Sequence, residues 1–392
     1  MVPHLRDDFN RRFTAARYQN FLKMLDEAAG AKVEFRVCET PVFMPEAVRL
    51  NFQQAALELM QQVSQPAYLA ASLAAVPAAF RVPHDDEHPL FLAIDFAITQ
   101  DDNGRMQPKL IELQGFPSLY AYQLVLCQTF MRAYELGELR YLLDDLSEAE
   151  YLRMFCTALL AGHDPENVIL MEIEPEQQKT AVDFVCTERF TGVKAVCITQ
   201  VKKRGRRLFY TASGREIPIH RIYNRVIIDE FVKKGLPIAF DFRDDLEVEW
   251  AGHPNWYFRI SKFSLPYLDH PAVPRTFFLH TLERYPEPLS HYVLKPLFSF
   301  AGSGVVIDLS RDQLDAIPAA ERRNYILQEK ISYAPVIQTP NEPAKAEIRM
   351  MFIWHDQPRL VNWLARLSKG KMMGVDYNKN KDWIGSSGCL YE

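Results

Sequence analysis

Apolar residues in the first third of the chain recur at three- and four-residue spacing, the period of helices that bury one face. This spacing predicts helices over residues 9–29, 45–62 and 67–80, the last interrupted at Pro77. Two dense apolar runs, 90–99 and 109–113, are typical of strands, and the Asp-Asp-Asn-Gly turn between them predicts a hairpin. Further helices are predicted over 118–136 and 147–162.

The pattern changes at residue 167, where short strands and a helix begin to alternate. Strand, helix and strand are predicted over 168–173, 176–190 and 193–201, the rhythm of an α/β unit with parallel strands. A hairpin over 206–219 follows. Because no G-x-G-x-x-G loop is present, this Rossmann-like region is not assigned a dinucleotide.

The last third is predicted to be mostly strands, over residues 292–296, 305–309, 325–330, 347–354 and 359–367. A tail rich in Gly, Asn and Lys follows them. Together these patterns predict an α/β fold in three parts. The parts are 1–162, with the N-terminal helices and the first hairpin, 163–262, the Rossmann-like region, and 263–392, with the remaining strands.

Composition narrows the class of protein without indicating an activity. The chain of 392 residues is 48% hydrophobic and 24% charged, as in ordinary globular proteins of two or three domains. A net charge of -5 lacks the basic excess of a nucleic-acid binder. The six cysteines show no C-x-x-C spacing, so neither a zinc site nor a disulfide framework is expected. We expect a cytoplasmic protein without a membrane partner, because no signal peptide or membrane-spanning stretch is evident. The oligomeric state is not indicated.

Carboxylates mark the first predicted hairpin. Asp95 interrupts an otherwise apolar strand, and Glu112 and Gln114, two residues apart, project to the same face of the next strand. Hard oxygen ligands clustered in this way are what Mg²⁺ accepts when it bridges nucleotide phosphates. The alternative is a structural salt bridge between such a carboxylate and a core arginine.

A second pattern lies about 180 residues further on. Lys295 ends one predicted strand, and a Gly302-Ser303-Gly304 turn opens the next segment. Backbone N–H groups freed of side chains can close over phosphate oxygens beside the charge of the lysine. A hairpin with a flexible turn and an incidental lysine is the alternative.

The strand that follows ends in polar and charged residues. Its last positions could present backbone groups to an adenine edge and apolar side chains to the adenine face; they are Gln328, Glu329, Lys330 and Ile331. A plain sheet strand is the alternative.

These segments together resemble the ATP-grasp superfamily, particularly its D-alanine ligase and glutathione synthetase branches. Lys295 and the Gly-rich loop are similar to the lysine strand and phosphate loop of that family, and Glu329-Lys330 to its hinge strand. Asp95 followed by Glu112-x-Gln114 is similar to its Asp strand and Glu-x-Asn strand, with Gln114 in place of the usual Asn.

Other segments extend the resemblance. Lys262 resembles the earlier phosphate-binding lysine of the family. Arg349, in Ala-Glu-Ile-Arg, resembles the D-x-R segment of glutathione synthetase, and Arg366 lies in a segment that looks like its A-R-x-P-x-G. The carboxylate strands, which usually end an ATP-grasp domain, here precede the lysine loop. This order resembles circularly permuted ATP-grasp proteins similar to glutathionylspermidine synthase.

The resemblance implies a circularly permuted ATP-grasp fold that binds ATP and Mg²⁺. Its chemistry is that of a carboxylate-amine ligase: a substrate carboxylate attacks the γ-phosphate, and an amine displaces phosphate from the acyl phosphate. Such an enzyme acts on a small-molecule carboxylate and a small-molecule amine. An ATP-binding scaffold without turnover and an ATP-dependent kinase are the alternatives.

The resemblance also implies roles for individual residues. Lys262 and Lys295 would neutralise phosphates, with Gly302, Ser303, Gly304 and the strand positions 328–331 completing the nucleotide site. Asp95, Glu112 and Gln114 would hold Mg²⁺, while Arg349 and Arg366 would stabilise the transferring phosphoryl group. Arg221 and Arg225 are candidates to bind the substrate carboxylate, or else form structural salt bridges, and Ser118 is a further candidate substrate contact.

Overall fold

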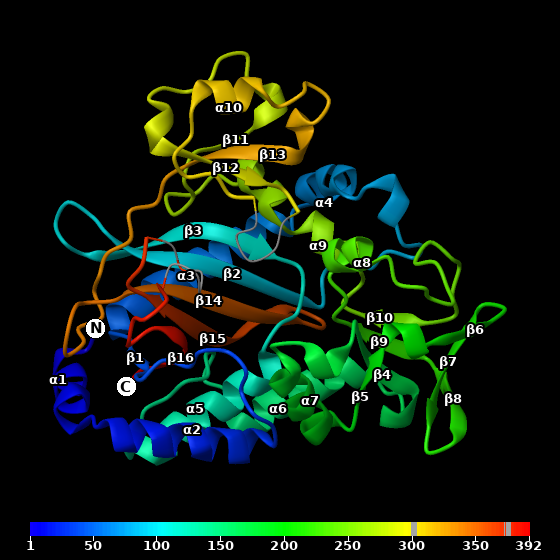
Figure 1. The fold of residues 1–392 in the computed structure, drawn as a ribbon, viewed down its shortest axis with the longest axis horizontal. Helices are drawn as coiled ribbons and strands as arrows, with labels where there is room; N and C mark the ends of the chain where they lie inside the picture. Colours follow the sequence, from blue (N-terminus) through cyan, green and yellow to red (C-terminus); the bar gives the residue numbers. More distant parts are fainter. Residues whose placement is uncertain (299–303, 372, 374–377) are drawn as a thin grey trace.

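A computed structural model describes residues 1–298, 304–371, 373 and 378–392. Its largest unit is a six-stranded sheet in the order β1-β16-β15-β14-β2-β3 (Figure 1). All neighbouring pairs are antiparallel except β1 and β16. The strands are β1 (Val42–Phe43), β2 (Phe91–Gln100), β3 (Met106–Gln114), β14 (Lys345–Trp354), β15 (Pro358–Ser368) and β16 (Gly385–Leu390).

Helices cover both faces of this sheet. α3 (Glu46–Val63) packs Phe52 and Leu59 against Leu92, Ile94 and Phe96 of β2. On the opposite face lie α5 (Tyr120–Tyr134) and α6 (Glu148–Leu160), and α2 (Ala15–Ala29) packs on α5. Because both faces are covered, nine of the ten residues of β2 are buried, Asp95 among them.

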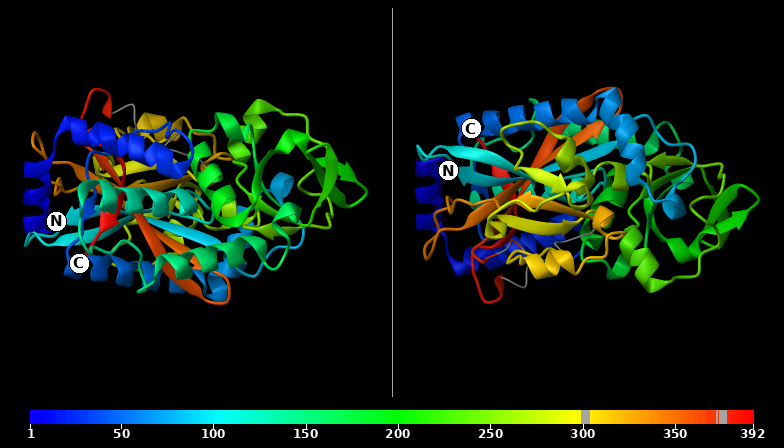
Figure 2. Two further views of the ribbon diagram at one scale, coloured as in Figure 1. Left: turned by 90° about the horizontal axis from the view of Figure 1, so that it is seen from below. Right: turned by 90° about the horizontal axis from the view of Figure 1, so that it is seen from above.

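A four-stranded parallel sheet in the order β10-β9-β4-β5 forms the second unit. It contains β4 (Val168–Glu172), β5 (Lys194–Cys197), β9 (Arg221–Asn224) and β10 (Glu249–Ala251), with α7 (Ala181–Thr191) connecting the first two. This arrangement confirms the predicted α/β rhythm of the middle region. The antiparallel β6 (Lys202–Arg204), β7 (Arg207–Ala212) and β8 (Arg215–Ile219) extend from it. Figure 2 shows this unit at one end of the molecule, beside the six-stranded sheet.

The third unit is a three-stranded antiparallel sheet in the order β11-β13-β12. Its strands are β11 (Thr276–Phe278), β12 (Tyr292–Pro296) and β13 (Tyr325–Glu329), and α10 (Arg311–Asp315) lies on its outer side (Figure 1). A 3-10 segment, η6 (Lys262–Tyr267), contacts both β3 and β11 and so joins this unit to the main sheet.

Several predicted elements differ from the structure. The helix predicted over 9–29 is two helices, α1 (Pro3–Arg12) and α2, because the Thr14 side chain accepts the Arg17 N–H and starts a new helix. The helix predicted over 67–80 is α4 (Pro66–Ser72) followed by two short 3-10 turns. The strand predicted over 305–309 is a single bridge between Val306 and Leu294.

Two strands of the main sheet were not predicted. β1 has only two residues, and β16 has the sequence Gly-Ser-Ser-Gly-Cys-Leu, which carries no apolar alternation. The first and last parts of the chain contribute strands to the same sheet, since β2 lies between β3 and β14. The boundaries at 162 and 262 stay predictions. No helix within the described residues has the length and apolarity needed to cross a membrane.

Candidate functional site

A buried ion pair between Asp95 and Arg349 lies at the centre of the six-stranded sheet. The two residues face each other on the neighbouring strands β2 and β14. Arg349 Nε and Nη2 each donate a hydrogen bond of 2.7 Å to one oxygen of Asp95, whose side chain is 2% exposed. The salt bridge to a core arginine, the alternative for Asp95, is therefore present, and metal binding by Asp95 stays a prediction.

Glu347 and Arg366 extend the pair along the same face of the sheet. They lie opposite each other on β14 and β15, and Arg366 Nη2 is 3.1 Å from Glu347 and 3.6 Å from Asp95. The hydroxyl of Tyr333 donates a 2.5 Å hydrogen bond to Glu347. Burial raises the pKa of Glu347, and the charge of Arg366 opposes this rise. Nothing in the sequence around Tyr333 indicates this role.

A bulge in the β2–β3 hairpin places Glu112 beside the pair. Leu110 lies opposite Phe96 and Glu112 opposite Asp95, so that Ile111 is the extra residue of β3. Leu110 therefore stays in the core, packed against α3. Glu112 lies directly opposite Asp95 on the neighbouring strand. Bulges of this kind re-aim side chains at functional sites.

Two lysines from other segments approach Glu112. Lys262 Nζ is 3.3 Å from Glu112 Oε2, and Lys295 Nζ donates a 3.4 Å hydrogen bond to the carbonyl of Ile111. Burial alone would raise the pKa of Glu112, but the charges of Lys262, Lys295 and Arg349 lower it to about 2. Burial lowers the pKa of Lys295 to about 8, against the attraction of Glu112. The structure thus brings Lys262 and Lys295 to one carboxylate.

Gly115 makes the approach of Lys262 possible. It follows the end of β3 and donates a 2.8 Å backbone hydrogen bond to Ile260, two residues before Lys262. A Cβ atom at this position would lie 2.4 Å from the carbonyl oxygen of Trp256, closer than real atoms come. Only glycine therefore lets the segment before Lys262 pack against the end of β3. The sequence contains this glycine directly after Gln114, but its contact is with a segment 140 residues away.

The predicted nucleotide strand β13 carries a buried amide without partners. Gln328 is 1% exposed, and within the described part of the chain neither its Nε2 nor its Oε1 finds a hydrogen-bond partner. Gln328 pairs with Val293 and Ile326 with Lys295, so Gln328 and Lys295 lie on the same face of this small sheet. The backbone N–H groups of Glu329 and Lys330 donate to Arg275 and His291 instead of facing a ligand. Ile331 follows the strand.

Gly304 is the described end of the predicted phosphate loop, while Gly302 and Ser303 lie outside the described residues. Gly304 has a φ of +74°, and a Cβ atom there would lie 2.8 Å from Cγ of Pro296. Both observations require glycine at the point where the chain returns to β12.

The two candidate substrate arginines have different surroundings. Arg221 donates to the carbonyls of Leu159 and Ala158, at 2.9 and 3.0 Å, and to the carboxylate of Glu249 at 2.9 Å. Because these carbonyls end α6, the contacts of Arg221 are structural. Arg225 lies at the carboxyl end of the parallel sheet and is 3% exposed.

The guanidinium of Arg225 is incompletely paired. Its Nε and Nη1 are buried without an acceptor among the described residues. It lies 4.9 Å from the ring centre of Phe116, in the loop between β3 and α5. Ser118 is a half-buried residue of the same loop. Arg225 therefore lies beside the loop that follows β3 and contains Ser118.

The oxygen atoms of this cluster decide where a divalent cation fits. Both oxygens of Asp95 accept hydrogen bonds from Arg349. Glu112 accepts a 2.6 Å hydrogen bond from Gln114 Nε2, whereas Gln114 Oε1 is buried without a partner among the described atoms. The described residues contain no cluster of three His, Cys, Asp or Glu side chains able to hold a metal ion. Glu112 and Gln114 fit Mg²⁺ as a two-ligand site, which suits an ion that also takes phosphates and water.

The described residues define a mixed α/β protein in which a buried charge cluster lies where two sheets meet. No protein-family model matches the sequence, and no curated protein sequence matches it. Among solved structures, the chain is similar to a glutathione synthetase-like effector from Globodera pallida, in its apo form. The two share 14% sequence identity and superpose with a TM-score of 0.54, over 95% of this chain and 97% of that one. The likeness shows a shared fold along nearly the whole of both chains.

Proposed function

We propose that this charge cluster binds the phosphates of ATP and that the protein is an ATP-dependent carboxylate-amine ligase. The observation that carries the proposal is an excess of positive charge among the described residues of one largely buried site. Four cations, Lys262, Lys295, Arg349 and Arg366, meet three carboxylates, Asp95, Glu112 and Glu347. They come from three segments that are distant in sequence, and a surplus cation of this kind favours an anionic ligand.

Gln328 supports adenine as the base. An amide presents one donor and one acceptor side by side, the pattern that pairs with N6 and a ring nitrogen of adenine. Gln328 is on the face of the small sheet that carries Lys295, so base and phosphates would lie along one face. Its two unpartnered amide atoms would then gain the hydrogen bonds they lack.

Glu112 and Gln114 would hold Mg²⁺. When bound, this ion would neutralise part of the phosphate charge. Asp95 then acts through Arg349, by holding its guanidinium in one orientation. Arg366 is 45% exposed at the side chain and can turn toward a ligand more readily than Arg349. Roles therefore divide between a buried arginine held in place and an exposed one that can move.

The chemistry needs a carboxylate placed beside the γ-phosphate. The free donors of Arg225 suit that carboxylate. Its oxygen attacks the γ-phosphorus and ADP leaves; the nitrogen of an amine then attacks the acyl carbon, and phosphate and a proton leave. The protein contributes positioning and charge stabilisation by Lys262, Lys295 and the arginines, as in other phosphoryl transfers.

The site must open to admit a nucleotide. The cavity lined by Glu112, Gln114, Phe116, Lys262 and Phe298 measures about 40 Å³, room for only a few water molecules. Leu297 and Phe298, which directly follow β12 of the three-stranded sheet, form one wall. We infer that this sheet moves away from β3 when ATP enters and returns over it.

Calorimetry with ATP and Mg²⁺ tests the nucleotide site. Lys295→Ala should weaken ATP binding at least about tenfold, because a buried charge-assisted contact is lost. Lys194→Ala, an exposed lysine on β5, is the matched control and should leave the affinity unchanged. Equal affinities of Lys295→Ala and the unaltered protein would refute the phosphate assignment.

An ATP-binding protein without turnover is the second candidate, because both oxygens of Asp95 are occupied by Arg349. ADP release that requires both a carboxylate and an amine supports the ligase. ATP binding without ADP release supports the silent protein, and a phosphorylated product would indicate a kinase. Glu112→Gln should abolish Mg²⁺-dependent ADP release.

A further inference from the structure

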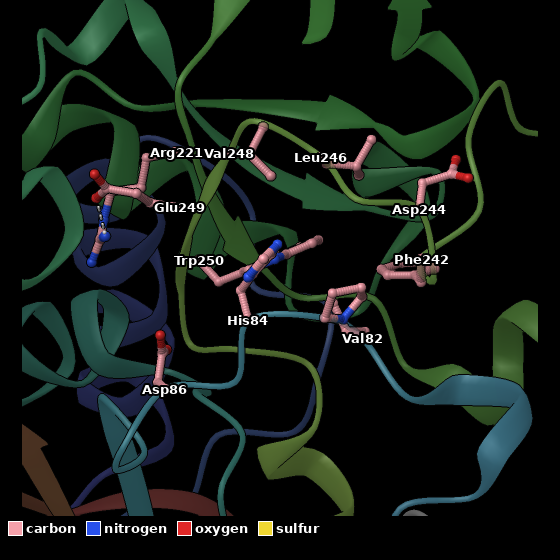
Figure 3. Close-up of a pocket in the computed structure, with 11 residues that line it drawn as sticks. Val82, His84, Asp86, Arg221, Phe242, Asp244, Leu246, Val248, Glu249 and Trp250 are labelled. Atoms are coloured by element: carbon pink, nitrogen blue, oxygen red, sulfur yellow. Dashed lines mark hydrogen bonds and ion pairs between the residues drawn. The ribbon is translucent and has the colours of Figure 1, made fainter. Parts of the chain in front are cut away.

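A cavity of about 300 Å³ lies outside the proposed ATP site, against the four-stranded parallel sheet. Figure 3 shows its two walls: the segment containing Val82, His84 and Asp86 on one side, and the segment from Phe242 to Trp250, which leads into β10, on the other. None of its lining residues belongs to the charge cluster around Asp95 and Glu112. Its volume is at the lower end of the range for small-molecule sites.

The wall formed by residues 82–86 is held firmly in place. The side-chain amide of Asn255 bonds both the N–H and the carbonyl of Val82, at 2.9 and 3.0 Å. His253 Nε2 lies 3.0 Å from the carbonyl of Pro83, and Arg259 donates to Asp85 at 2.7 Å. This wall of the cavity is therefore formed without any ligand.

Asp86 is the carboxylate of this cavity that lacks a countercharge in contact. Of the other two lining carboxylates, Glu249 pairs with Arg221 at 2.9 Å and Asp244 with Lys203 at 2.5 Å. Within the described parts of the chain, no hydrogen bond or ion pair reaches Asp86. Its side chain points toward the Arg221–Glu249 pair (Figure 3), but each guanidinium nitrogen of Arg221 already donates to Glu249 or to a carbonyl at the end of α6.

The rest of the lining is apolar and aromatic. Trp250 and Phe242 stack with ring centres 6.0 Å apart, and Val82, Leu246 and Val248 complete the surface. An unpaired carboxylate beside an indole and an apolar wall is a combination that binds an ammonium group attached to a hydrocarbon chain. An anionic ligand would instead face the carboxylates of Asp86, Asp244 and Glu249 in this lining.

We propose that this cavity is a binding site for a small alkylammonium ligand, with the ammonium group on Asp86 and the hydrocarbon part against Trp250 and Leu246. The proposal does not depend on the function proposed above. It assigns a second ligand site to the protein, on the parallel sheet, for an organic cation.

Binding of n-pentylammonium, followed by ligand-observed NMR on the full chain, tests the proposal. The matched probes are 1-pentanol, which has the same chain without charge, and pentanoate, which has the opposite charge. Pentylammonium should bind about tenfold more tightly than pentanol, and pentanoate should not bind, since a charge-assisted contact forms only with the cation. Equal binding of pentylammonium and pentanol, or no binding of pentylammonium, would overturn the proposal.

Variants of residues in and near the cavity test where pentylammonium binds. Asp86→Asn should weaken pentylammonium binding about tenfold and leave pentanol unchanged, because only the charge is lost. Glu247→Gln, an exposed carboxylate on the segment that forms the opposite wall, is the control and should have no effect. Unchanged pentylammonium affinity in Asp86→Asn would refute the assignment. Lys295→Ala should retain pentylammonium binding even if ATP binding is lost, which separates this site from the nucleotide site.

The pH dependence supplies a second readout. Burial raises the pKa of Asp86 to about 6, opposed by Arg221 and reinforced by Asp85 and Glu249. His84 and Asp244 are the other titratable groups of the lining. Because the cation requires ionised Asp86, pentylammonium affinity should fall as the pH is lowered through about 6. This fall should be absent in Asp86→Asn; its persistence there would assign the titration to another group and overturn the role of Asp86.

Discussion

Arg349 holds both oxygens of Asp95 across the β14–β2 pair, with two hydrogen bonds of 2.7 Å. Burial alone would lower the pKa of Arg349, but Asp95, Glu112 and Glu347 raise it above its usual value. Arg349 is therefore charged, and its two hydrogen bonds to Asp95 have the geometry of a guanidinium–carboxylate pair. Removing one partner leaves an uncompensated charge in the middle of the sheet.

Asp95→Asn should consequently lower the free energy of unfolding by about 3–5 kcal/mol. Asp356→Asn, at an exposed turn between β14 and β15, is the control and should change it little. Urea denaturation measures both. Replacing the pair together, by Asp95→Leu with Arg349→Met, should recover most of the loss, because neither member of the pair is left buried without the other. An Asp95→Asn variant as stable as the unaltered protein would contradict the buried pair.

Gln328→Leu should stabilise the protein and impair recognition of the base. Leucine has a similar volume and removes two buried polar atoms that lack partners, so the free energy of unfolding should rise by about 1 kcal/mol. If the Gln328 amide recognises adenine, calorimetry should show that the Gln328→Leu variant no longer prefers ATP over GTP. Gln54→Leu, on the exposed side of α3, serves as the control. A destabilised variant would mean that Gln328 has a partner within the fold.

The hairpin that carries the carboxylates could be predicted because its signals are local. Asp95 stands out in an apolar strand, and the Asp-Asp-Asn-Gly turn fixes the partner strand. No local sequence signal indicates that Lys262 and Lys295 lie close to Glu112. Only the resemblance to a family assigned the three residues to one site. The bulge at Ile111 could not be predicted, because it depends on how β3 packs between α3 and the charge cluster.

Other features were beyond prediction for physical reasons. The partner of Asp95 is 254 residues away in the chain, so only tertiary contact identifies Arg349 as that partner. β16 has almost no apolar pattern and is placed by pairing with β15. Arg221 and Arg225 look equivalent in sequence, four residues apart. Their difference arises from α6, whose last carbonyls meet only Arg221.

This difference predicts opposite outcomes for the same substitution. Arg221→Lys should lower the free energy of unfolding by about 1–3 kcal/mol, because one ammonium group cannot serve two carbonyls and Glu249 in the same geometry. Arg225→Lys should change it by less than about 1 kcal/mol, since the lost donors had no acceptor and the charge is kept. Thermal unfolding compares the two. Stabilisation by glutarate, a dicarboxylate probe, should be weakened in Arg225→Lys and retained in Arg221→Lys; the reverse pattern would exchange their roles.

Glu172, at the carboxyl end of β4, should make stability depend on pH. Burial raises its pKa to about 7, although Arg225 opposes the rise, and the N–H of Ile173 donates a 2.8 Å hydrogen bond to it. The folded state therefore binds more protons than the unfolded state between pH 4.5 and about 7. The stability contributed by the protonated group is complete below pH 4.5 and is lost as the pH rises through 7. Glu172→Gln should reduce the fall in unfolding free energy between pH 5 and 8 by about 2 kcal/mol, measured by urea denaturation at each pH. Glu176→Gln, an exposed neighbour, should leave the fall unchanged, and an equal fall in Glu172→Gln would assign the titration to another group.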